Sequence, residues 1–187
     1  MRIRDLFKNV LAVLACVLPL ALHAANPPQV GGAAPNFTLT TLDDKKVSLS
    51  DLTSSGNVVL VELRGWVGYT CPFCTKQVND FVRDAAKFKA AGVQVLFVYP
   101  GPSDELKAHA AKFLADKSWP ADFQFVLDPD YEFTKAYGLR WEAKGETAYP
   151  STFIIDAGNK VRFAHISKAH GNRVGAPEVL KVLAEIK

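Results

Sequence analysis

The sequence has few side chains that bind transition metals, since its 187 residues include only Cys 3 and His 4. A structural zinc site needs four ligands, and the pair formed by Cys71 and Cys74 has no second cysteine pair to complete one. His109, His165 and His170 are too scattered along the chain to form a ligand motif. We therefore expect neither a metal nor another cofactor.

The sequence also lacks a strong charge of either sign. Its formal net charge is +3, and basic residues at the N-terminus supply most of it. Because there is no basic run, nothing indicates a nucleic acid or an anionic membrane surface as a partner. Internal repeats and low-complexity tracts are absent too, and the length fits one domain of ordinary size.

Long hydrophobic runs are missing apart from one near the N-terminus. Residues 1–24 begin with basic side chains, continue into VLAVLACVLPLAL and end in small residues at Ala24, the order of a secretory signal peptide. The apolar run is shorter than the roughly 20 residues of a membrane-spanning helix, and Pro19 interrupts it. A lipoprotein cleavage at Cys16 fits less well because a further apolar stretch follows. We expect cleavage at Ala24, export to the periplasm, and no membrane attachment afterwards.

The rest of the chain reads as a tether followed by one domain. Residues 25–35 are rich in Pro and Gly and are expected to be flexible. The domain is expected to span residues 36–187. It opens with FTLTTLDDKKVSLSDL, which alternates like a short β-hairpin with DDKK as its turn.

Two buried strands and a helix between them form the centre of the predicted domain. Val58–Leu63 and Val93–Tyr99 are rich in β-branched and apolar residues, as is typical of strands buried on both faces. From Cys74 onwards, apolar side chains recur at helical spacing, and Gly92 is placed to end the helix. The three elements predict a βαβ unit with parallel strands, whose chemistry lies at the carboxyl end of the first strand.

The C-terminal half alternates helices and strands. Ser103 is expected to cap a helix, FQFVL to form a third strand, and Gly138 to end a short helix. STFIID and KVRFAHI read as a hairpin across AGN, and Pro177 starts a closing helix. The order predicts an α/β fold in which helices flank a central mixed β-sheet with an N-terminal β-hairpin.

Cys71 and Cys74 stand where the first buried strand gives way to the helix. Pro72 suits the first helical position, which makes Cys71 the N-cap and Cys74 the third helical residue. A thiolate at the N-cap faces the positive end of the helix dipole, and this lowers its pKa. We expect Cys71 to be the nucleophile and Cys74 the resolving thiol. Cysteines three positions apart enclose too small a loop to stabilise the domain, so their role is chemical.

Two charged residues near the end of the first buried strand are candidate catalytic groups. Glu62 interrupts an otherwise apolar strand, where a lone carboxylate is costly unless it is paired or functional. It either lies beneath the pair and carries the proton of Cys74, or is a partly exposed carboxylate paired with Arg64 or a lysine. Arg64 either holds Cys71 as a thiolate or is an ordinary surface arginine.

From about Phe37 to its end, the chain resembles the thioredoxin-fold redoxins, and among them the alkyl hydroperoxide reductase and thiol-specific antioxidant family of peroxiredoxin-like proteins. The hairpin, VVLVELRGW, CPFC and AYPSTFIIDAGNKVRF carry the resemblance. It implies a thioredoxin-like fold with Cys71 at the peroxidatic position. Peroxiredoxins also carry a proline, a threonine and an arginine around that cysteine, whereas this chain has Arg64, Gly68 and Pro150 there.

Thioredoxins and the exported disulfide reductases related to cytochrome maturation share other features with this chain. They have CxxC, an acidic residue in the preceding strand, which Glu62 matches, and a cis-proline before a strand, which PSTF resembles. This resemblance implies a cis bond between Tyr149 and Pro150. The loop between Glu62 and Cys71 is longer here than in those families.

Together these features predict an exported enzyme, monomeric or weakly dimeric, that cycles Cys71 and Cys74 between dithiol and disulfide. Its substrate is a hydroperoxide or a protein disulfide, and an unidentified thiol donor reduces it again. The alternative is a thioredoxin-like disulfide reductase without peroxidase activity. A copper-carrying redoxin domain without turnover, with His165 and His170 as donors, is the rival outside the enzymes. The rim of the site is expected to consist of five residues: Trp66, Tyr69, Phe73, Tyr149 and Pro150.

Overall fold

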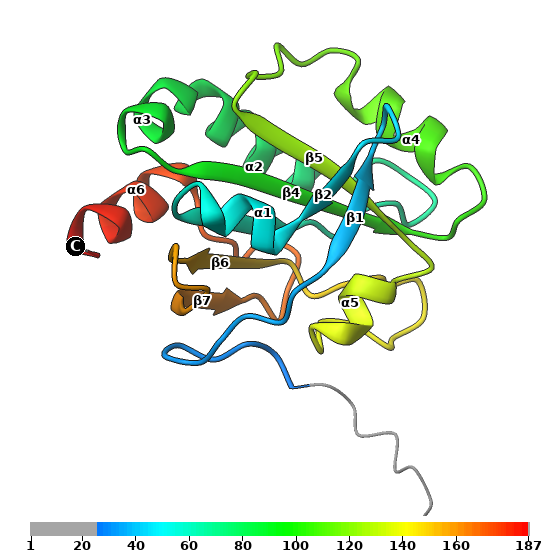
Figure 1. The fold of residues 1–187 in the computed structure, drawn as a ribbon. Helices are drawn as coiled ribbons and strands as arrows, with labels where there is room; N and C mark the ends of the chain where they lie inside the picture. The colour runs from blue at the N-terminus through cyan, green and yellow to red at the C-terminus, as the bar shows by residue number, and fades with distance from the viewer. Residues whose placement is uncertain (1–25, 187) are drawn as a thin grey trace, which may run out of the picture.

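The computed structural model describes residues 26–186, so the predicted signal peptide at residues 1–24 lies outside the described residues. The strands are β1 (Thr38–Thr41), β2 (Lys46–Ser48), β3 (Val58–Glu62), β4 (Gln94–Gly101), β5 (Phe123–Pro129), β6 (Ser151–Ile155) and β7 (Val161–Ile166). The helices are α1 (Leu49–Ser54), α2 (Pro72–Arg83), α3 (Ala85–Ala90), α4 (Leu106–Leu114), α5 (Glu132–Ala136) and α6 (Ala176–Glu185). Within this part of the chain, the predicted mixed sheet with flanking helices and an N-terminal hairpin is confirmed (Figure 1).

The sheet has the strand order β2-β1-β5-β4-β3-β6-β7. Its three central strands, β3, β4 and β5, are parallel, while the strands on both sides of them run antiparallel to their neighbours. Every residue of β3 is buried, as expected of a parallel strand covered on both faces. The predicted βαβ unit of β3, α2 and β4 is therefore confirmed.

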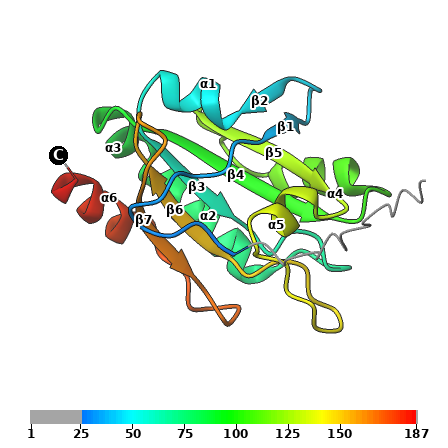
Figure 2. The same ribbon diagram turned by 60° about the horizontal axis from the view of Figure 1, so that its bottom comes forward.

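Two layers of helices cover the sheet (Figures 1 and 2). The first hydrophobic cluster joins one face of the sheet to α2, α3, α4 and α6, and the second joins the other face to α1 and α5. Successive strand residues point to opposite faces. In β3, Val59 and Val61 accordingly lie in the first cluster with the cysteines, whereas Val58 and Leu60 lie in the second.

Two helix boundaries differ from the prediction. The helix after the cysteines is interrupted at Asp84, whose φ of −95° and ψ of 11° separate α2 from α3. Ser103 does not cap α4, because its backbone N–H donates to the Asp130 side chain at 3.0 Å and stays in the preceding loop. Helix α4 begins instead at Leu106, after Glu105 in a left-handed conformation with φ of 64°.

Several segments outside the regular elements are held against the sheet. Residues 31–34 of the expected tether run beside the start of β7, with backbone hydrogen bonds from Gly31 to Val161 at 2.8 Å and from Ala34 to Asn159 at 3.0 Å. The loop between α5 and β6 and the loop between β7 and α6 project on the same side of the molecule (Figure 2). Side chains from both of these loops meet near the start of α2.

Candidate active site

The two cysteines lie at the start of α2, beyond the carboxyl end of β3, as the sequence predicts. Cys71 is the N-cap of α2, and Pro72 is its first residue. Cys74 lies one turn further in, on the side of the helix that also buries Val78 and Phe81. Within the described residues both cysteines are free thiols, with exposed fractions of 2% for Cys71 and 1% for Cys74.

The pKa of the Cys71 thiol is lowered from its ordinary value to about 5. A hydrogen bond from the Cys74 thiol is the largest cause, and burial opposes it. The backbone N–H groups of Cys74 and Phe73 in the first helical turn also lower this pKa, although neither completes a capping hydrogen bond with the sulfur. At neutral pH Cys71 is therefore a thiolate, which is the nucleophilic form of cysteine.

The pKa of the Cys74 thiol is instead raised well above its ordinary value. Burial is the main cause, because it disfavours a charged sulfur, and the hydrogen bond to Cys71 adds to the effect. The proton of the pair thus stays on Cys74 while Cys71 carries the negative charge. This difference suits Cys71 to attack an oxidant and Cys74 to resolve the product.

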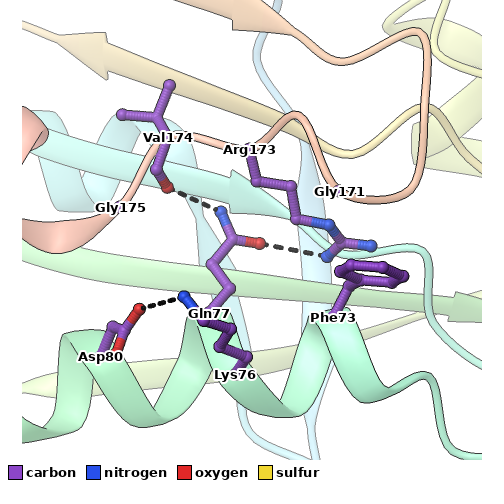
Figure 3. A pocket seen from close by; sticks show the side chains of 8 residues that line it. All are labelled: Phe73, Lys76, Gln77, Asp80, Gly171, Arg173, Val174 and Gly175. Carbon is purple, nitrogen blue, oxygen red and sulfur yellow. Dashed lines mark hydrogen bonds and ion pairs between the residues drawn. The ribbon is translucent and has the colours of Figure 1, made fainter.

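Arg173, a residue that the sequence analysis did not single out, lies against both sulfurs. Its Nη1 atom is 3.3 Å from the Cys74 sulfur, and its Nη2 atom is 3.8 Å from the Cys71 sulfur. After the hydrogen bond from Cys74, its charge is a further cause of the lowered pKa of Cys71. Gln77 holds the guanidinium by accepting from Nη1 at 3.1 Å, and itself donates to the Val174 carbonyl at 3.1 Å (Figure 3).

Arg173 was missed because nothing local connects it with the cysteines. It belongs to the loop between β7 and α6, and the only indication in the sequence is a basic residue within the glycine-flanked stretch HGNRVG. The contact forms because β6 and β7 lie beside β3 in the sheet, which brings the end of β7 near the start of α2. Periodicity and motif spacing carry no information about such a contact.

A small cavity of about 70 Å³ opens beside Arg173 (Figure 3). Residues of α2 and of the loop between β7 and α6 line it: Phe73, Lys76, Gln77, Asp80, Gly171, Arg173, Val174 and Gly175. Phe73 is 46% exposed, and its ring lies against Gly171, where a Cβ atom would be 3.1 Å from the ring. The loop therefore rests directly on the residue between Pro72 and Cys74.

Glu62 neither lies beneath the cysteines nor is partly exposed and paired with Arg64 or a lysine, so both predicted positions are wrong. Its side chain leaves β3 on the other face of the sheet, where it is fully buried and accepts a 2.8 Å hydrogen bond from Thr134 of α5. The reason is the two-residue period of a strand, which turns Val61 toward the cysteines and Glu62 away from them. Burial and the nearby Asp128 raise the pKa of Glu62 well above its ordinary value.

Arg64 is neither exposed nor bonded to Cys71. It is 3% exposed, and its Nε atom donates to Glu146 at 2.7 Å. Its Nη1 atom donates to the Tyr69 hydroxyl at 2.7 Å, and its Nη2 atom donates to the Gly145 carbonyl at 3.0 Å. Arg64 therefore ties the loop before the cysteines to the loop between α5 and β6, and the cation at the sulfurs is Arg173.

The aromatic residues expected at the rim fall into two groups. Trp66 and Tyr69 line an open groove of about 480 Å³ next to Thr70, and Tyr69 is 50% exposed. Tyr149 stacks on Trp141 with ring centroids 4.9 Å apart, on the loop between α5 and β6. The groove that Trp66 and Tyr69 line thus reaches Thr70, the residue before Cys71, whereas Tyr149 lies on another loop.

The expectation of a cis bond at Pro150 is wrong. No peptide bond in residues 26–186 is cis, so the bond between Tyr149 and Pro150 is trans. Pro150 is buried just before β6, and its carbonyl accepts the backbone N–H of Ser167 at 2.9 Å. The trans form is also the preferred one for X-Pro bonds.

The histidines of the copper-binding alternative contact other groups. The Nε2 atom of His170 is 3.0 Å from Glu146, and that of His165 is 2.9 Å from the Asn172 carbonyl. In the part of the chain that the structure describes, no three His, Cys, Asp or Glu side chains are grouped as metal ligands. The helices of that part are also too short or too polar to cross a membrane.

Comparisons with known proteins relate this chain to a family. The AhpC/TSA family model matches residues 30–164. The thiol-disulfide oxidoreductase ResA of Bacillus subtilis (strain 168) is 31% identical over 158 residues, which cover 82% of this chain and 79% of ResA. The chloroplastic peroxiredoxin Q of Oryza sativa subsp. japonica is 29% identical over 157 residues, which cover 83% of this chain and 67% of that protein.

A solved structure shares the fold. The crystal structure of peroxidoxin BcpB from Mycobacterium tuberculosis matches with a TM-score of 0.70 at 23% sequence identity. The match covers 86% of this chain and 99% of the other. The arrangement of sheet and helices described above is therefore that of the thioredoxin fold, as the sequence predicts.

Proposed function

Because the chain belongs to the AhpC/TSA family and is a thiol-dependent oxidoreductase, we propose that it reduces hydroperoxides by cycling Cys71 and Cys74 between dithiol and disulfide. The single observation that carries this proposal is a buried pair of cysteines, one deprotonated and one protonated, that both lie against the same arginine. Cys71 has a pKa of about 5, and Cys74 keeps its proton. Arg173 lies within 3.8 Å of the first sulfur and 3.3 Å of the second.

The proposed cycle has three steps. The Cys71 thiolate attacks the terminal peroxide oxygen, so that an S–O bond forms, the O–O bond breaks, and the alkoxide leaves and takes a proton from water. The sulfenic acid on Cys71 is then attacked by the Cys74 sulfur. An S–S bond forms, and the hydroxide leaves as water with the proton of Cys74. A thiol donor finally reduces the disulfide by thiol–disulfide exchange.

Two features favour a hydroperoxide as the oxidant. Cys71 is only 2% exposed, so a small molecule reaches its sulfur more readily than a sulfur held in another protein. Arg173 also provides charged N–H donors where negative charge develops on the departing oxygen. The arginine thereby supplies a positive charge at the site although Pro150 stands at the family's arginine position.

A protein disulfide is the second candidate substrate, and one specific observation favours it. Phe73 and Tyr69, next to the cysteines in the chain, are 46% and 50% exposed. Exposed aromatic side chains beside a reactive group are suited to contact a partner protein. In this reaction Cys71 attacks a substrate sulfur directly, and Cys74 releases the reduced substrate from the mixed disulfide.

Stopped-flow oxidation of the reduced protein would distinguish the two candidates. All variants carry Cys16→Ser, so that only Cys71 and Cys74 react, and tryptophan fluorescence follows the oxidation. The oxidants are hydrogen peroxide, cumene hydroperoxide and disulfide-bonded insulin. We expect both peroxides to react far faster than they do with free cysteine. The Cys71→Ser variant should not react, and Cys74→Ser should stop at a sulfenic acid that dimedone traps.

If peroxides react no faster than they do with free cysteine while insulin is reduced quickly, the substrate is a protein disulfide and the proposal of a peroxidase is wrong. Slow reaction with all three oxidants would contradict both candidates.

The cellular setting belongs to the same proposal. The order of residues in the first 24 positions supports export to the periplasm. In an oxidising compartment a disulfide persists until a specific donor reduces it, so the cycle requires a dedicated thiol protein as electron donor. Cleavage at Ala24 is tested by N-terminal sequencing of the protein from the periplasmic fraction.

A further inference from the structure

Glu146 connects two loops that meet near the cysteines. One of its carboxylate oxygens accepts the Nε–H of Arg64 at 2.7 Å, and the other lies 3.0 Å from the Nε2 atom of His170. The side chains of Arg64 and Glu146 are 4% and 13% exposed, so water screens this ion pair only weakly. Arg64 lies two residues beyond the buried end of β3, and this pairing fixes Glu146 relative to the sheet.

His170 continues the connection to the sulfurs. Its carbonyl oxygen accepts the Nε–H of Arg173 at 2.7 Å, and the Nη atoms of the same guanidinium face Cys71 and Cys74. The guanidinium has a second anchor in Gln77, at 3.1 Å. Without the anchor at His170, Arg173 would be held by one side chain and would cover a wider range of positions.

We propose that Glu146 and His170 are positioning residues of the thiol pair, which hold the loop between β7 and α6 so that Arg173 stays against Cys71 and Cys74. This inference rests on the proposed function, because it takes the Cys71 thiolate as the working nucleophile. Neither residue touches a sulfur. Their effect reaches the chemistry through Arg173.

The charge of the Glu146 carboxylate, which accepts the hydrogen bond from His170, supports this positioning role. Partial burial alone would raise the pKa of Glu146, but hydrogen bonds from Arg64 and His170 hold it below its ordinary value. Glu146 therefore stays charged wherever Cys71 is a thiolate, and a charged acceptor makes the stronger hydrogen bond. His170 donates its Nε2–H in this contact either as the corresponding neutral tautomer or when protonated.

Three titratable or charged groups face the Cys71 sulfur or act on it: Cys74 from α2, Arg173 from the loop between β7 and α6, and Tyr99 from β4. Among them, only Arg173 is bonded to His170. We therefore expect a change at His170 or Glu146 to alter the pKa of Cys71 mainly through the position of Arg173.

The test is the pKa of Cys71, taken from the pH dependence of its alkylation by iodoacetamide in a Cys16→Ser protein. His170 is 36% exposed in its side chain, so His170→Ala should fold. We expect it to raise the Cys71 pKa, but by less than the shift of about one unit expected when the Arg173 charge itself is removed, because the guanidinium is displaced and not lost. His170→Gln keeps an N–H donor, so the pKa of Cys71 should rise less in this variant than in His170→Ala. Glu142→Gln is the matched control for Glu146→Gln, because Glu142 lies on the same loop as Glu146 and is 76% exposed.

A second set of variants tests whether Glu146 acts by positioning Arg173 or by a general disturbance of the fold. Glu146→Gln should raise the Cys71 pKa in the native background and leave it unchanged in an Arg173→Gln background. An unchanged pKa in His170→Ala and Glu146→Gln, or equal shifts with and without Arg173, would overturn the inference. Alkylation needs no physiological oxidant, so this result is independent of whether the protein reduces peroxides.

Discussion

Single residues set the reactivity of the cysteine pair. The two thiols lie within one helical turn, but the surroundings of Cys71 stabilise a negative charge and those of Cys74 disfavour one. Cys71 at the helix start is stabilised as an anion by the Cys74 thiol, by backbone N–H groups and by Arg173. Cys74 points into the apolar cluster, where a charge is unfavourable. The division into nucleophile and resolving thiol therefore follows from burial and from hydrogen bonding.

The first prediction concerns Arg173. Replacing it by Gln removes the cation at the sulfurs, so the pKa of Cys71 should rise by about one unit from its value near 5. The rate of alkylation by iodoacetamide at acidic pH should fall several-fold, because less of the thiol is ionised there. Arg162→Gln is the control, since Arg162 pairs with Asp156 at 3.2 Å. Identical pH profiles for the two variants would show that Arg173 does not stabilise the thiolate.

The second prediction concerns Tyr99, which is 1% exposed. Its hydroxyl is buried without a hydrogen-bond partner among the residues that the structure describes. A buried unpaired polar group costs about 1 to 3 kcal/mol, so Tyr99→Phe should increase the free energy of unfolding by about 1 kcal/mol. Urea denaturation of the reduced protein measures this difference. A loss of stability would mean that the hydroxyl contributes a favourable interaction.

At this scale the sequence predicts the residues that act locally and misses those that act across the fold. The N-cap position of Cys71 follows from Pro72 alone and is correct. Glu62 and Arg64 were considered as catalytic groups of the pair, but Glu62 bonds to Thr134 and Arg64 pairs with Glu146, and both partners come from other segments. Arg173 is the clearest case, because a residue 99 positions from Cys74 is brought to its sulfur by the fold.

At the scale of elements, β3, β5 and α5 enclose two carboxyl groups away from the cysteines. The Thr134 hydroxyl lies 2.8 Å from Glu62 and 2.5 Å from Asp128, and its single proton can serve only one of them. The second oxygen of Glu62 has no partner among the described residues. Burial is the main cause that raises the pKa of both acids, and for Glu62 the charge of Asp128 adds to it.

The third prediction is a pH dependence of stability. A carboxyl group whose pKa is raised on folding contributes its full stability below its unfolded pKa and loses it as pH rises through the folded pKa. For Glu62 this window begins near its ordinary pKa of 4.5 and extends upward. Glu62→Gln removes this titration, so its stability relative to the native protein should increase as the pH rises across the window.

Urea denaturation at several pH values measures the effect, and Glu178→Gln serves as the control because Glu178 lies in the exposed first turn of α6. If the stability of Glu62→Gln and that of the native protein change in parallel with pH, the expected proton uptake at Glu62 is ruled out.

Elements with an uninterrupted hydrophobic pattern in the sequence were predicted correctly. The buried strands β3 and β4 and the hairpins at both ends of the domain are present, because their alternation or β-branched composition decides their conformation. The break at Asp84 was missed because the apolar stripe continues across it to Phe88. The start of α4 was misplaced because Ser103 bonds to Asp130 of another segment.

At the scale of the whole molecule, the charges at the pair determine how strongly the enzyme oxidises or reduces its partners. Stabilising the Cys71 thiolate stabilises the dithiol form, which makes the disulfide easier to reduce. The fourth prediction is that Arg173→Gln makes the reduction potential more negative, by about 30 mV for a pKa change of about one unit. Equilibration with glutathione buffers at neutral pH measures it, with Arg162→Gln as the control. A potential that does not change would contradict a role for Arg173 in stabilising the dithiol.

The overall architecture could be anticipated, but its loops could not. The order of strands and helices, together with the CPFC motif, leads to a thioredoxin-like sheet with the cysteines at the end of β3. The loop that carries Glu146 contacts the loop that carries His170. This contact depends on the lengths and turn conformations of both loops, which no pattern in the sequence indicates. Most of the additional site residues come from these two loops.

The contact between Phe73 and Gly171 limits how relatives of this protein can vary. A Cβ atom at position 171 would come within 3.1 Å of the Phe73 ring, which lies between the two cysteines in the chain. A side chain at 171 would displace either the ring or the loop that carries Arg173. Among homologues, a larger residue at 171 should therefore occur together with a smaller one at 73, so that the two positions are inherited as a pair.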